Sequence, residues 1–127
     1  MFSGRRVLLV DDDDGIREML AIGLQDEGLD VRAARDGLQA LALLADWHPD
    51  AIVLDLMMPT MDGWMFRDEQ RRHGLAPGVP VVIVSAALDL DRHVELLGAA
   101  TSLVKPFDFA ALLATLQRVM GDPESLT

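Results

Sequence analysis

Residues 49–59 read Pro-Asp-Ala-Ile-Val-Leu-Asp-Leu-Met-Met-Pro. From Ala51 to Met58 the stretch is apolar, apart from one carboxylate, Asp55. A continuous apolar run of this length favours a strand that is covered on both faces, as in a parallel sheet. Burying an unpaired carboxylate is costly, and Leu56 and the two methionines after it begin no helix that Asp55 could cap. The position therefore favours a functional carboxylate over a cap or a turn former.

Other short apolar runs lie on both sides of this one, and segments of helical periodicity separate them. The runs cover residues 7–10, 31–34, 79–84 and 102–104. A helix is expected over residues 64–72, closed by Gly74. The other helices are expected around the apolar positions Ile16, Met19, Leu20 and Leu24; Leu38, Leu41, Leu44 and Ala45; Val94, Leu96 and Leu97; and Ala110, Leu113, Leu116 and Met120. Strand–helix pairs joined by short loops predict right-handed crossovers and a doubly wound α/β sheet.

Length and composition limit the classes of protein that remain. At 127 residues the chain has the usual size of one domain, which we expect over residues 1–121, with a short polar tail over 122–127. A net charge of -10 argues against direct binding to nucleic acid and fits a cationic ligand. The chain has no cysteine, which excludes thiolate metal sites. No apolar run reaches the ~18–20 residues of a membrane span, so we expect no membrane insertion and a cytoplasmic location.

Polar side chains follow four of the predicted strands. Asp11 and Asp12 follow the first strand, Asp55 ends the third, Ser85 ends the fourth and Lys105 follows the fifth. Ligands of open parallel sheets bind outside the carboxyl ends of the strands. Carboxylates, a hydroxyl and an ammonium group are therefore expected to converge on one edge.

The acidic run of residues 11–14 indicates a metal site. Asp13 or Asp14 is expected to cap the first helix, which leaves Asp11 and Asp12 at the strand end. Carboxylates crowded in this way repel one another unless they share a cation. Oxygen ligands suit Mg²⁺ or Mn²⁺ better than zinc, and Lys105 is a natural counter-charge.

Five separated segments are informative when they are taken together and in order: residues 7–12 (VLLVDD), 49–59, 61–63 (MDG), 80–86 (PVVIVSA) and 105–107 (KPF). Together they resemble the response-regulator receiver family of two-component signalling, over roughly residues 5–120. The resemblance implies a (βα)5 fold with the flavodoxin-like strand order 2-1-3-4-5. It also implies a phosphorelay in which Asp55 takes a phosphoryl group from a histidine kinase, a phosphotransfer protein or a small phosphodonor.

The resemblance implies the metal ligands. Asp12 and Asp55 would bind Mg²⁺ (or Mn²⁺) through their carboxylates, and Met57 through its main-chain carbonyl. Asp11 would hold the ion and its waters. The protein would catalyse only its own phosphorylation and slow dephosphorylation, and we do not expect an enzyme acting on a separate substrate.

The contacts and the switch are implied in the same way. Ser85 would bond one phosphoryl oxygen and Lys105 would pair with another, with the Lys105–Pro106 peptide bond cis. Movement of Ser85 would shift the loop that begins with Ala86, and the helix after it. The family commonly has an aromatic residue where this chain has Ser102, so the aromatic toggle cannot operate here. Either the backbone of residues 85–90 carries the signal, or coupling is weak.

Two further positions bear on the lifetime of the signal. In the family, side chains at the positions of Met57 and Ala87 influence how water attacks the acyl phosphate. Neither side chain is polar here, so we expect slow dephosphorylation.

Partners are also expected from the resemblance. The kinase or phosphotransfer protein would dock near residues 14–27. A downstream protein would bind the face made by the fourth helix, the fifth strand and the fifth helix, where Leu88 and Leu90 lie beside Asp89, Asp91 and Arg92.

Two alternatives remain. A phosphorylation-independent scaffold of the same fold normally loses part of the acidic set or the lysine, and both are present here. The sequence signature of a haloacid-dehalogenase-type phosphatase can be matched to residues 12–15. The register is wrong, however, because the strand ends at Asp11, one residue before the first aspartate of the signature, and Ile16 stands where threonine is usual.

The histidines and tryptophans suggest no second site. His48, His73 and His93 lack metal-ligand spacing and are expected at the surface. Trp47 and Trp64 are expected to be packing residues.

Overall fold

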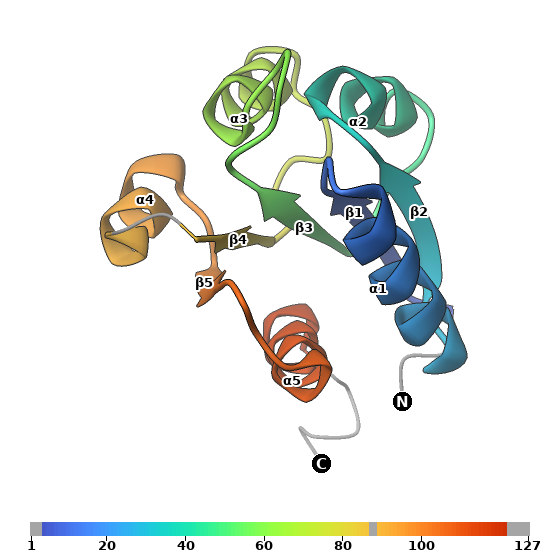
Figure 1. Ribbon diagram of the computed structural model, residues 1–127. Coiled ribbons are helices and arrows are strands. Elements are labelled where there is room, and N and C mark those ends of the chain that lie inside the picture. Colours follow the sequence, from blue (N-terminus) through green and yellow to red (C-terminus); the bar gives the residue numbers. More distant parts are fainter. Residues whose placement is uncertain (1–3, 87–88, 122–127) are drawn as a thin grey trace.

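The computed structural model describes residues 4–86 and 89–121, which form a parallel five-stranded sheet with helices on both faces (Figure 1). The strands are β1 (Arg6–Val10), β2 (Asp30–Ala34), β3 (Ala51–Asp55), β4 (Val81–Ser85) and β5 (Thr101–Val104). The helices are α1 (Asp14–Asp26), α2 (Gly37–Leu44), α3 (Gly63–Arg72), α4 (Leu90–Leu97) and α5 (Phe109–Met120). The predicted alternation of strands and helices is confirmed, while the predicted tail, 122–127, lies outside the described residues.

The strand order is β2-β1-β3-β4-β5, and every pairing is parallel. The predicted fold is therefore confirmed. The order reverses direction between β1 and β3, and such a switch point opens a crevice outside the carboxyl ends of the strands. Asp11 and Asp12 follow β1 and Asp55 ends β3, so all three carboxylates stand at this crevice.

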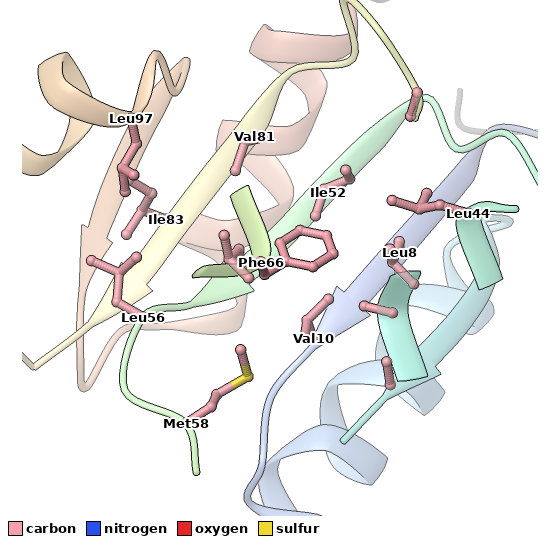
Figure 2. Packing of buried hydrophobic residues seen from close by; sticks show 14 of the residues in the cluster. Leu8, Val10, Leu44, Ile52, Leu56, Met58, Phe66, Val81, Ile83 and Leu97 are labelled. Atoms are coloured by element: carbon pink, nitrogen blue, oxygen red, sulfur yellow. The ribbon is translucent and has the colours of Figure 1, made fainter. Parts of the chain in front are cut away.

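Two hydrophobic layers cover the sheet. Helices α2, α3 and α4 pack on one face, where Phe66 lies among Leu8, Val10 and Ile52 (Figure 2). Helices α1 and α5 cover the other face, against alternate residues of the same strands. Because both faces are covered, residues 7–10 of β1, 51–54 of β3 and 81–84 of β4 are all apolar, which explains the uninterrupted runs in the sequence.

Three of the large apolar residues that marked the expected helices do lie on those helices, but outside the core. Met19, Leu38 and Leu96 are each more than half exposed. Each is the sequence neighbour of a buried residue of the same helix. One residue turns the helix by about 100°, so the neighbour takes the core position. Strand β4 also begins at Val81 rather than Val79.

The hydropathy of the helices shows whether any of them could span a membrane. Among the helices of the described residues, none combines the length and the apolar character needed to cross a bilayer.

Close packing places the segment after β3. Gly63 begins α3 directly against this segment, and a Cβ at Gly63 would lie 2.8 Å from the Cα of Leu56. The main-chain N–H of Gly63 donates to the Leu56 carbonyl at 3.0 Å. The start of α3 is thus pressed against the residue that follows Asp55.

Gly63→Ala is expected to lower the free energy of unfolding by about 1–3 kcal/mol, because the added methyl group overlaps backbone that cannot move aside cheaply. Urea unfolding followed by circular dichroism measures the change. Gly15→Ala is the matched control, since a Cβ there meets nothing closer than 3.5 Å. It is expected to stabilise by up to about 1 kcal/mol through helix propensity. Equal stability of Gly63→Ala and the unaltered protein would contradict the packing argument.

Candidate functional site

The ends of two strands, β1 and β3, bring an acidic cluster together. Asp11, Asp12 and Asp55 each offer a carboxylate oxygen, and these oxygens lie within 4.8 Å of one another. Asp11 and Asp55 are buried, whereas Asp12 is exposed. The cluster therefore has a closed side formed by the sheet and an open side at Asp12.

Lys105 joins the two buried carboxylates. Its Nζ donates to Asp11 Oδ2 at 2.9 Å and to Asp55 Oδ2 at 3.1 Å. The other oxygens are also bonded: the Asp13 N–H donates to Asp11 Oδ1 at 2.9 Å and the Met57 N–H to Asp55 Oδ1 at 3.0 Å. Because both oxygens of each carboxylate accept a hydrogen bond, Asp11 and Asp55 are held in fixed orientations.

The pKa values of Asp55 and Lys105 are both raised, but for different reasons. Burial raises the pKa of Asp55, and the N–H of Met57 and the ammonium of Lys105 offset this only in part. Burial also disfavours the charge of Lys105, but the hydrogen bonds and charges of Asp11 and Asp55 outweigh it and raise the pKa of Lys105. The lysine thus stays charged, but its charge only partly offsets the cost of burying the Asp55 carboxylate.

The donor set fits a divalent cation. Three carboxylates lie beside one ammonium group, which pairs with two of them. This leaves an excess of two formal negative charges in a space a few ångströms across. All the available donors are hard oxygens, and the exposed side at Asp12 leaves room for water. These features suit Mg²⁺ or Mn²⁺.

Ser85 lies at the same edge of the sheet. It is fully buried at the end of β4, one residue beyond Val84, which pairs with Asp55. The Ser85 carbonyl accepts from the Lys105 N–H at 2.9 Å, which ties the ends of β4 and β5 together. The Lys105–Pro106 peptide bond is cis, as predicted.

The start of α1 confirms the predicted cap and adds a residue that the sequence did not indicate. Asp13 is the N-cap and accepts from the Ile16 N–H at 2.9 Å. Arg17 Nη1 donates to the Asp11 carbonyl at 2.8 Å, and its Nη2 bonds Asp14 Oδ1 at 2.6 Å. Arg17 thereby fastens the main chain that carries the acidic cluster. An arginine on a helix is usually solvated, so no sequence signal identified it.

Other predicted residues have mixed outcomes. The Met57 side chain is exposed, and the role of its carbonyl stays a prediction. Trp47 is buried, as predicted. His93 was wrongly assigned to the surface: its ring meets Trp64 edge-on with centroids 5.0 Å apart, and its Nδ1 is buried with no partner among the described residues. Ala87 lies outside the described residues.

Comparison with known proteins gives a consistent result. A family model described as "Response regulator receiver domain" matches residues 7–117. The chain is 38% identical to the regulatory protein AtoC of Escherichia coli over 117 residues, covering 91% of this chain and 25% of AtoC. The chain spans a quarter to a half of the length of the curated relatives it matches.

Solved structures resemble this one closely. The chemotaxis protein CheY4 of Vibrio cholerae is 36% identical, with a TM-score of 0.85, over 92% of this chain and 99% of that one. The receiver domain of the sensor histidine kinase PA1611 of Pseudomonas aeruginosa is 32% identical, with a TM-score of 0.84, over 94% of this chain and 100% of that one. That structure has a magnesium ion coordinated in its active-site cleft.

A divalent cation is expected to stabilise this protein. Mg²⁺ at ten times its dissociation constant would add about 1.4 kcal/mol to the free energy of unfolding, measured as a rise in the thermal midpoint. Asp12→Asn removes a cluster ligand from an exposed position, so it is expected to abolish most of the rise without loss of folding. Asp14→Asn, an exposed neighbour outside the cluster, is expected to retain it. Equal rises in the two variants would place the ion elsewhere.

Proposed function

The chain belongs to the response regulator receiver domain family, and from that premise we propose that Asp55 is the residue that accepts the phosphoryl group. One observation carries this proposal: a buried carboxylate at the end of the central strand bonds a charged lysine beside two further carboxylates. The donor would be a phosphohistidine of a kinase or phosphotransfer protein, or a small phosphodonor.

The chemistry is a transfer between two anions. One carboxylate oxygen of Asp55 attacks phosphorus, the bond from phosphorus to the donor breaks, and its electron pair leaves with the donor. Lys105, already paired with the acceptor, offsets part of the charge that gathers on the phosphoryl oxygens. Mg²⁺ or Mn²⁺ held by Asp11, Asp12, Asp55 and the Met57 carbonyl would supply the rest of the positive charge.

The protein phosphorylated on Asp55 would be the signalling state. A phosphoryl group on Asp55 brings about two negative charges and three acceptor oxygens into the buried end of the sheet. Lys105 would pair with one oxygen and the Ser85 hydroxyl would donate to another. A shift of Ser85 would move the following main chain, Ala86 onward, and with it α4. Ser102 offers no ring to follow this movement, so the backbone is the proposed route.

An apolar hollow beside the site supports a docking position for the phosphate donor. It has a volume of about 340 Å³ and is lined by Ile16, Met19, Leu20, Ala86, Lys105, Pro106 and Phe107. Lys105 belongs to both the hollow and the acidic cluster. A histidine-bearing helix that packs its apolar side here would stand next to Asp55. The exposed Met19 side chain would then be covered by the docked helix.

A second hollow supports an output surface on α4 and β5. It measures about 600 Å³ and is lined by Ala86, Asp89, Leu90, Asp91, Arg92, Ser102 and Val104. Of the two apolar residues expected to make this contact, Leu90 needs correction because it is buried, and Leu88 lies outside the described residues. Leu96 and Val104 are the exposed apolar residues of α4 and β5. We propose that a downstream protein binds this face, without direct contact to nucleic acid.

We propose no turnover of a separate substrate, and a cytoplasmic site of action. The phosphatase alternative would make Asp12 and Asp14 its paired carboxylates. Asp14 instead begins α1, is exposed, and pairs with Arg17, an arrangement that favours Asp55 as the acceptor.

Incubation with acetyl phosphate and Mg²⁺ is expected to add the mass of one phosphoryl group to the intact protein. Asp55→Asn is expected to abolish the gain, because an amide is not a nucleophile of this kind. Asp46→Asn, an exposed aspartate before the opposite end of β3, is the control and is expected to be phosphorylated normally. Phosphorylation of Asp55→Asn at the normal rate would contradict the assignment.

Slow loss of the phosphoryl group is expected, because the exposed Met57 side chain cannot position water. Met57→Asn combined with Ala87→Glu is expected to accelerate decay about tenfold or more, by supplying polar groups that orient and activate a water. Decay of the phosphorylated protein is followed by mass spectrometry after the donor is removed. Met65→Asn, an exposed methionine on α3, is the control. Decay of the unaltered protein as fast as that of the double variant would contradict the prediction.

A further inference from the structure

Two arginines of α3 bind the carboxyl-terminal end of α4. Arg67 donates through Nε to the Leu97 carbonyl at 2.9 Å and through Nη2 to the Gly98 carbonyl at 3.2 Å. Arg71 Nη2 also donates to the Leu97 carbonyl. The last carbonyls of a helix lack partners within the helix and carry partial negative charge. The arginines satisfy these carbonyls from a neighbouring helix.

Arg67 is itself held by a buried polar side chain. Its Nη1 donates to Gln70 Oε1 at 2.9 Å, and Gln70 Nε2 donates to the Leu75 carbonyl at 3.1 Å. Gln70 is only 1% exposed. Burial and the neighbouring charge of Arg71 lower the pKa of Arg67, so placing this cation here has a free-energy cost. A buried glutamine with its hydrogen bonds made restricts Arg67 to one arrangement.

Gly98 makes room for this contact. It ends α4 with a positive φ of 62°, and a Cβ at this position would overlap Nη2 of Arg71. The residue type, the backbone conformation and the arginine contact therefore agree at this end of the helix.

The amino-terminal end of α4 is held differently. Asp89, its N-cap, has φ 59° and ψ 42°, and in the described part of the chain its side chain makes no capping hydrogen bond. This end continues from the segment after Ser85. Between the two ends, His93 of α4 meets Trp64 of α3 edge-on. The helix is thus clamped at one end and uncapped at the end nearer the acidic cluster.

We propose that Arg67 and Arg71 are positioning residues that hold the carboxyl-terminal end of α4 on α3, so that α4 pivots about this end. The amino-terminal end then follows the main chain after Ser85 when Asp55 is phosphorylated. This pivot rests on the proposed function. Since Ser102 cannot transmit a ring movement, rotation of α4 is the change that a partner at the α4–β5 face would detect.

Hydrogen exchange at the end of α4 tests the clamp without any ligand. The Gly98 N–H donates to the Glu95 carbonyl and the Ala99 N–H to the Val94 carbonyl. Arg67→Met removes two hydrogen bonds to this end of α4. It is expected to raise the exchange rates of these amides about tenfold or more, since the loss of even one charge-assisted hydrogen bond has an effect of that size. Exchange in β1 and β3 is expected to stay unchanged, which separates a local effect from general destabilisation.

Matched variants complete this test. Arg72→Met is the control, because Arg72 lies on the same helix but bonds Glu69. It is expected to exchange like the unaltered protein. Arg67→Lys keeps the charge and is expected to restore part of the protection. Arg71→Met, at an exposed position, gives the same test if Arg67→Met does not fold. Unchanged exchange at Gly98 and Ala99 in Arg67→Met, or in Arg71→Met where that variant stands in for it, would overturn the proposal.

Beryllofluoride with Mg²⁺, a mimic of the aspartyl phosphate, tests the pivot. In the unaltered protein, exchange is expected to change over residues 90–93 and to stay constant at Gly98 and Ala99. In Arg67→Met both ends are expected to change. Equal change at both ends of the unaltered protein would overturn the pivot. Failure of beryllofluoride to bind would overturn the proposed function and the pivot with it, while the ligand-free exchange would still decide whether the arginines hold α4.

Discussion

A single ammonium group serves two buried carboxylates, and the rest of the structure is arranged around that shortage of positive charge. Lys105 follows the last strand and reaches Asp11 and Asp55 at the ends of β1 and β3. This contact is possible because parallel strands in the order β2-β1-β3-β4-β5 finish at one edge. Asp12 adds a third carboxylate on the open side. The sheet therefore presents a rigid site whose charge is unbalanced until a cation binds.

Rigidity and imbalance have separate sources. The hydrophobic layers on both faces fix the strands, and main-chain N–H groups fix the carboxylates of Asp11 and Asp55. Neither supplies a full positive charge. Functional sites commonly contain features that do not favour stability. Here that feature is the excess of carboxylates over positive charges. A site of this kind responds to a divalent ion, which adds two positive charges, and to a phosphoryl group, which replaces the single negative charge of the Asp55 carboxylate by about two.

The two ends of α4 extend the same contrast to the surface. One end is bound by Arg67 and Arg71 with the support of buried Gln70, and the other continues from the segment after Ser85 without a side-chain cap. In the proposed pivot, a change at the acidic cluster would enter α4 at its less restrained end. The hollow lined by α4 and β5 residues lies at this helix, where a partner would meet the movement.

Much of this protein was readable from the sequence. The alternation of strands and helices and the acidic residues at the strand ends follow from local patterns, since burial on both faces requires apolar runs and ligands collect where strands end. The order of the strands in the sheet was implied by the resemblance to the receiver family. The exposure of Met19, Leu38 and Leu96 and the burial of one side of His93 were not readable. Nor were the contacts of Arg17, Arg67 and Gln70, whose acceptors include main-chain carbonyls that every residue carries. The sequence by itself determined which charged groups gather at the edge of the sheet, because they stand at strand ends. The tertiary structure alone decided which main-chain carbonyls the long side chains of Arg17, Arg67 and Gln70 would reach.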